Sequence, residues 1–106
     1  MSDLEALKQR RQSPRFREWK GSVADDTIAA AVGSIDELID RVVSLGGAPN
    51  EDDVRQAVSE CVTRFNHLDD GWITTIERED IADAILGVVE LSGFEADEDW
   101  IDDREW

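Results

Sequence analysis

The sequence predicts an all-α protein: a small bundle of three main helices, plus a weak N-terminal helix and an acidic C-terminal tail. Three segments carry large apolar residues at intervals of three and four, the spacing that aligns them along one side of a helix. No segment alternates apolar and polar residues for long enough to form a good strand. With 106 residues, 41% of them hydrophobic, the chain suits one domain with a single core. We therefore expect an N-terminal arm (1–21), a helical bundle (22–93) and a tail (94–106).

The arm is expected to contain a short helix. Ser2 and Glu5 have the spacing of a capping box, in which each side chain accepts a hydrogen bond from the backbone of the other. Pro14 would stop this helix, because the residue before a proline is pushed out of the helical conformation. Leu4 and Leu7 are its only large apolar residues, so the predicted helix is weak.

The second helix is expected to start after Ser22, a favoured N-cap residue. Asp25 and Asp26 would then lie in the first turn, where the helix dipole favours carboxylates. The glycine pair at 46–47 would end the helix. Its apolar stripe consists of Ile28, Val32, Ile35, Ile39 and Val42.

The third helix is expected to start after Asn50, another favoured N-cap residue, and to end before the turn signal Asp-Asp-Gly at 69–71. Its stripe consists of Val54, Val58, Cys61, Phe65 and Leu68.

The fourth helix is expected to start at a second capping box, formed by Thr74 and Glu77, and to end at Gly93. Gly33 and Gly87 lie inside otherwise good helices, which suggests that these two helices cross closely there. The stripe of the fourth helix consists of Ile81, Ile85, Val88 and Leu91. Among all the stripes, the residues that we expect at the centre of the core are Leu38, Ile39, Val58, Phe65, Ile81 and Ile85.

No catalytic, cofactor-binding or metal-binding motif is evident. Cys61 and His67 are six residues apart, which is not the spacing of two ligands on one helical face, and Cys61 falls in an apolar stripe. The tail does not fit a calcium loop, because it lacks the turn glycine and Ile101 stands where an oxygen ligand is needed. We therefore expect a protein that is not an enzyme and that uses no cofactor.

Charge is the most informative functional feature. The formal net charge is −15, from 26 acidic and 11 basic residues. The first 20 residues are basic, with six cations and three acids, whereas residues 94–106 hold seven acids and only Arg104. Such a body repels nucleic acid and attracts basic partners. The basic arm either binds single-stranded nucleic acid or docks on the acidic body, and the body's charge favours docking.

Two acidic segments contain tryptophan and are the candidate partner-binding site. The tail tryptophans either pack back on the bundle or form a motif for a basic partner, to which exposed aromatic rings would be anchors. The candidate residues are Asp69, Asp70 and Trp72 in the turn, and Asp97, Asp99, Trp100, Asp102, Asp103 and Trp106 in the tail.

The favoured function is a small acidic binding protein that caps a basic protein surface, for example a toxin-neutralising or nucleic-acid-mimicking inhibitor. In size, helix content and acidity the chain is similar to the immunity proteins that neutralise nuclease toxins. It has no tyrosine, so the tyrosine-bearing motif of the best-known immunity family is absent and no residue roles carry over. The alternative is a self-associating structural or scaffold subunit, such as a homodimer. With one cysteine, no apolar signal segment before Pro14 and no membrane-spanning run, we expect a cytoplasmic location and no membrane partner.

Overall fold

A computed structural model describes residues 3–12, 16 and 19–106. Its helices are α1 (Leu4–Gln12), α2 (Asp25–Ser44), α3 (Glu51–Leu68) and α4 (Thr75–Leu91), followed by a 3₁₀ helix, η2 (Glu98–Ile101). No β-strand occurs in this described part of the chain. The structure therefore confirms the all-α bundle.

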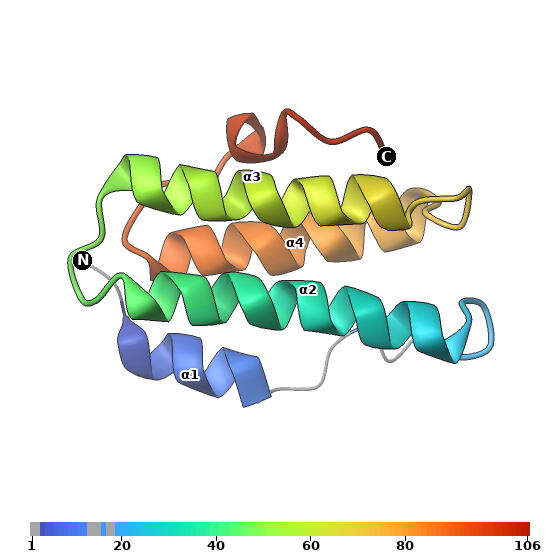
Figure 1. The fold of residues 1–106 in the computed structure, drawn as a ribbon, viewed down its shortest axis with the longest axis horizontal. Helices are drawn as coiled ribbons and strands as arrows, with labels where there is room; N and C mark the ends of the chain where they lie inside the picture. The colour runs from blue at the N-terminus through green and yellow to red at the C-terminus, as the bar shows by residue number, and fades with distance from the viewer. Residues whose placement is uncertain (1–2, 13–15, 17–18) are drawn as a thin grey trace.

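The three long helices lie side by side, and the two shorter elements cover opposite sides of them (Figure 1). α1 packs against α2 and α4, whereas η2 packs against α3. The described segments contain no helix with the length and apolar character needed to cross a membrane.

The predicted core is confirmed. Phe65 of α3 is fully buried. The other five expected core residues are each at most 1% exposed: Leu38, Ile39, Val58, Ile81 and Ile85.

The predicted caps of α3 and α4 are also confirmed. The side chain of Asn50 accepts a hydrogen bond from the Asp52 backbone N–H at 2.8 Å. Thr74 and Glu77 form the capping box, in which the Thr74 backbone N–H donates to Glu77 Oε1 at 3.1 Å. Gly93 ends α4 with a φ of 96°, a left-handed conformation that glycine adopts without strain.

The predicted start of α2 is wrong by two residues. The N-cap position is Ala24, not Ser22, and no side chain caps the helix there. Ser22 instead belongs to a tight turn, in which its backbone N–H donates to the Trp19 carbonyl at 2.9 Å and Gly21 has a φ of 93°. This turn docks Trp19 into the core, so the burial of a large ring overrides the local capping preference of serine.

The predicted capping box of α1 involves Ser2, which lies outside the described residues. Asp3 performs a capping role, because its Oδ1 accepts a hydrogen bond from the Ala6 backbone N–H at 3.0 Å. Leu7 is completely buried, so α1 is docked on the bundle, as the body's charge favoured.

The predicted close crossing at Gly33 and Gly87 is wrong. No neighbouring atom would lie within 4 Å of a Cβ at Gly33. At Gly87, a Cβ would overlap the guanidinium group of Arg10. The glycine in α4 therefore accommodates a guanidinium group of α1, not the backbone of α2.

Candidate functional site

The acidic tail lies along α3 and runs in the same direction as that helix (Figure 1). Its 3₁₀ turn is capped by Asp97, whose Oδ1 accepts a hydrogen bond from the Asp99 backbone N–H at 3.0 Å. Ile101, at the end of this turn, is completely buried. The tail is therefore an ordered part of the bundle surface.

Trp100 fastens the first half of the tail to α3. Its side chain is only 6% exposed, and its Nε1 donates to the Glu95 carbonyl at 3.0 Å. The guanidinium carbon of Arg55 lies 4.1 Å from the ring centroid, a cation–π contact that covers the ring from the α3 side. Phe94 packs beside it, with ring centroids 5.9 Å apart.

Trp106 and Asn66 attach the second half of the tail to α3. The Trp106 ring meets Phe65 edge to face with centroids 6.1 Å apart and is 8% exposed. Asn66 of α3 donates to the Asp103 carbonyl at 3.2 Å and accepts from the Glu105 backbone N–H at 2.8 Å. The Trp106 Nε1 is buried without an acceptor in the described structure. A buried N–H group without a partner costs free energy, so Trp106 holds the tail less strongly than Trp100 does.

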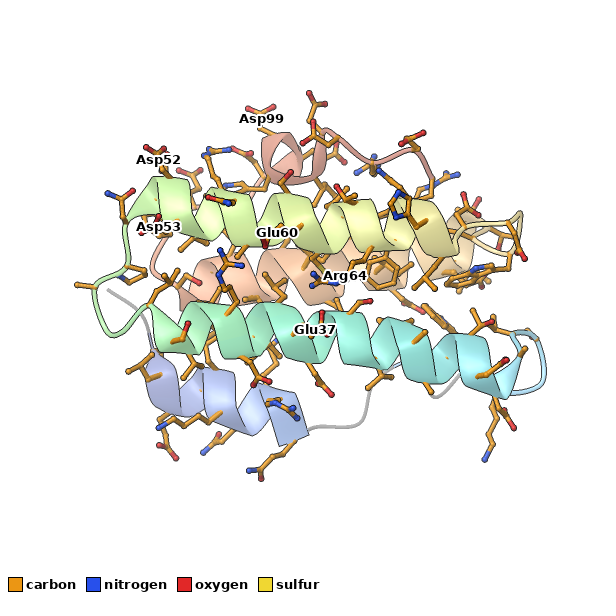
Figure 2. The ribbon with its side chains drawn as sticks, in the orientation of Figure 1. Glu37, Asp52, Asp53, Glu60, Arg64 and Asp99 are labelled. Carbon is orange, nitrogen blue, oxygen red and sulfur yellow. The ribbon has the colours of Figure 1, made fainter. Side chains whose placement is uncertain are left out.

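Three large apolar side chains of the tail, Trp100, Ile101 and Trp106, are thus buried, and its carboxylates are exposed. Both tryptophans are buried, so of the two interpretations left open the structure supports packing back on the bundle. Trp100 and Trp106 attach the tail, because α3 offers apolar surface and the guanidinium group of Arg55. Figure 2 shows Asp99 pointing away from the bundle. The seven tail carboxylates are all exposed, and we call them the tail face: Glu95, Asp97, Glu98, Asp99, Asp102, Asp103 and Glu105.

The turn between α3 and α4 is built differently from the tail. Asp69 accepts a hydrogen bond from the Gly71 backbone N–H at 3.0 Å, which stabilises the turn, and Asp70 is exposed. Trp72 is half-buried: its Nε1 donates to the Leu68 carbonyl at 2.7 Å, and its ring meets Trp19 at a centroid distance of 5.5 Å. Trp72 is therefore tied to the segment before α2, not to the tail.

A groove between α2 and α3, which the sequence analysis did not anticipate, holds two ion pairs (Figure 2). Arg41 Nη1 lies 2.7 Å from Glu60 Oε2, and Arg64 Nε lies 3.3 Å from Glu37 Oε2. The second pair is near enough for electrostatic attraction but is not aligned as a hydrogen bond. In the sequence, Glu37 and Arg41, like Glu60 and Arg64, have the four-residue spacing of pairs within one helix. The pairs instead form between helices, so spacing alone could not reveal the groove, whose volume is about 370 Å³.

Cys61 is a buried core residue of α3, as its place in the stripe predicted. Burial raises the pKa of its thiol from 9.0 to about 12, although the nearby charge of Arg64 opposes the shift. The described residues contain no group of three or more histidine, cysteine or acidic side chains that could hold a metal ion.

The buried thiol gives a testable prediction. We expect Cys61 in the folded protein to react with a thiol reagent at least about a hundredfold more slowly than in denaturant, because reaction requires opening of the core. Between pH 9.0 and about 12, the unfolded thiol ionises while the folded one stays protonated, so the free energy of unfolding falls as the pH rises. An exposed Thr63→Cys thiol in a Cys61→Ala background is the control. Equal labelling rates for the two thiols in the folded state would contradict the prediction.

Comparisons with protein-family models, curated proteins and solved structures found no match for this chain.

Proposed function

We propose that this chain is a small acidic binding protein, and that its tail face caps a basic surface of a protein partner. One observation carries the proposal: all seven tail carboxylates are exposed while Trp100, Ile101 and Trp106 are buried beneath them. The apolar residues thereby fix the position of the charges.

A fixed acidic surface suits this role for two reasons. Concentrated charge of one sign accelerates encounter with an oppositely charged partner. A segment already ordered on its own body also loses less conformational entropy when the partner binds than a free tail would lose. In a concrete form, the partner would be a toxin or another nucleic-acid-binding protein in the cytoplasm, and the role would be inhibitory rather than catalytic.

The alternative, a self-associating scaffold subunit, has less support. Permanent subunit interfaces are rich in apolar surface. Within the described ranges, the one large apolar side chain that is exposed is Ile76, at 65%. A single exposed isoleucine does not make the apolar patch that such an interface needs.

Binding to nucleic acid also has less support. The tail face repels phosphate groups, and two cations of the basic arm, Arg10 and Arg11, contact oxygen atoms of the bundle itself.

The proposal is tested by capturing the partner with two matched variants of the full chain. The tail-neutral variant carries Glu98→Gln, Asp99→Asn, Asp102→Asn and Glu105→Gln. It spares Asp97 and Asp103, whose side chains make hydrogen bonds in the structure. The control variant removes the same number of exposed charges from other helices: Glu5→Gln, Asp25→Asn, Glu79→Gln and Glu90→Gln.

The three chains are used to capture proteins from extracts of the cells that naturally express this chain. We expect the natural chain and the control variant to retain one basic protein, and the tail-neutral variant to lose it. Retention of that protein by all three chains would place the binding surface elsewhere. Loss with both variants would mean that overall charge, not the tail face, causes the attraction.

A further inference from the structure

The groove between α2 and α3 carries charges of both signs on both of its walls. Its volume of about 370 Å³ falls within the range of roughly 300–1,000 Å³ that is typical of small-molecule sites. None of its lining residues belongs to the tail face, so the groove is a separate feature of the surface. Its charged residues are Glu37, Asp40 and Arg41 from α2, and Glu60 and Arg64 from α3 (Figure 2).

The first ion pair of the groove leaves much of its hydrogen-bonding capacity unused. Arg41 Nη1 donates to Glu60 Oε2 at 2.7 Å, and neither side chain makes another hydrogen bond to the described residues. A guanidinium group has several N–H donors, and a carboxylate can accept several hydrogen bonds. N–H groups of Arg41 and the second oxygen of Glu60 are therefore available to a ligand.

The second ion pair is satisfied even less well. Arg64 Nη2 donates to the Ser34 carbonyl at 3.2 Å, but Arg64 Nε is buried without an acceptor. The Glu37 carboxylate, 3.3 Å from this nitrogen, is 67% exposed and accepts no hydrogen bond from the described residues. A buried donor without a partner costs about 1–3 kcal/mol, whereas exposed ion pairs contribute roughly 0–1 kcal/mol. Stability of the bundle therefore does not account for this arrangement.

The other lining residues restrict what could enter the groove. Both oxygens of Asp40 already accept hydrogen bonds from Arg11, at 2.6 and 3.2 Å, so this carboxylate adds little attraction for a cation. Leu38 and Ala57 are at most 2% exposed, so they offer little surface to a large apolar group. A fitting ligand is therefore small and polar.

The signs of the available charges determine the class of ligand. A simple anion would be repelled by Glu37 and Glu60 and by the net charge of −15, whereas a simple cation would be repelled by Arg41 and Arg64. A molecule with one positive and one negative group avoids both penalties. Because such a molecule is neutral overall, the net charge of the chain does not oppose its approach.

We infer that the groove binds a small zwitterion, the chemical class of free α-amino acids. The ammonium group of the ligand donates to the exposed carboxylates of Glu37 and Glu60. Its carboxylate accepts hydrogen bonds from Arg41, with the positive charge of Arg64 beside it. This site goes beyond the proposed function and requires neither the tail face nor a protein partner.

The test is a nuclear magnetic resonance titration of the full ¹⁵N-labelled chain with glycine, L-alanine and L-glutamine. Acetate and methylammonium, which carry one charge each, and glycine betaine, which has both charges but no N–H donor, are the control compounds. The groove variant carries Arg41→Gln with Glu60→Gln, which removes an exposed ion pair. The control variant removes the same two charges from exposed positions of α4, by Arg78→Gln with Glu79→Gln. The amide spectrum verifies that each variant is folded, and Glu60→Gln alone replaces the groove variant if it is not.

We expect at least one of the three amino acids to cause saturable shifts in residues 34–41 and 57–64, with a Kd of about 1 mM or lower. The groove variant should bind at least about tenfold more weakly, and the control variant should bind as the natural chain does. Binding should change little with salt, because the ligand is neutral overall. Absence of saturation up to about 10 mM of each amino acid, equal affinity for the groove variant, or saturable shifts from any control compound would overturn the proposal.

Discussion

Replacement of Phe65 by alanine is expected to lower the free energy of unfolding by about 3–5 kcal/mol. Phe65 is completely buried in α3, and its ring also supports Trp106 of the tail. Small domains have a total stability of roughly 5–15 kcal/mol, so this change threatens folding itself.

The measurement is chemical denaturation followed by circular dichroism. Thr63→Ala, an exposed position on the same helix, is the control and should change stability by less than about 0.5 kcal/mol. A loss below about 1 kcal/mol for Phe65→Ala would mean that this part of the core is not packed as described.

The second large effect is expected at Trp100. Trp100→Ala should cost about 3–5 kcal/mol of unfolding free energy, because the ring is buried and its Nε1 makes a hydrogen bond. Trp106→Ala should cost less, because removing that side chain also removes a buried N–H group that has no acceptor in the described structure. Denaturation curves of the two variants provide the comparison.

Trp100→Phe separates packing from hydrogen bonding at the same position. It should retain most of the packing and lose about 1 kcal/mol for the hydrogen bond. A larger loss for Trp106→Ala than for Trp100→Ala would contradict the description of how the tail is attached.

The bundle could be predicted from the sequence because its signals are local and repeated. The apolar stripes, the Asn50 cap and the Thr74–Glu77 capping box each determine a structure within a few residues. Three stripes of this kind can leave water only by packing together, so the core followed directly.

The errors arose where partners distant in the sequence override local preference. Ser22 does not cap α2, because burial of Trp19 shapes the preceding turn. Gly87 faces Arg10 of α1 rather than Gly33 of α2, and no local pattern indicates that pairing.

That the tail residues form a binding site stays a prediction, and the sequence did not show how the tail is attached to the bundle. The carboxylates of the tail are exposed, as a charged segment suggests, but the aromatic residues serve attachment instead of recognition. The one relevant residue in the sequence was Arg55, near the start of the third stripe, whose guanidinium group covers the Trp100 ring. Spacing within one helix cannot show which distant ring an arginine covers.

The proposed binding of a basic partner by the tail face is tested most directly by the association rate. The rate constants for binding the captured partner are measured at several salt concentrations for the natural chain, the tail-neutral variant and the control variant. We expect the tail-neutral variant to associate about tenfold more slowly at low salt and to show a flatter salt dependence, with a smaller change in dissociation. The control variant should lose much less, because its four missing charges lie on α1, α2 and α4. Equal association rates for the two variants would contradict the claim.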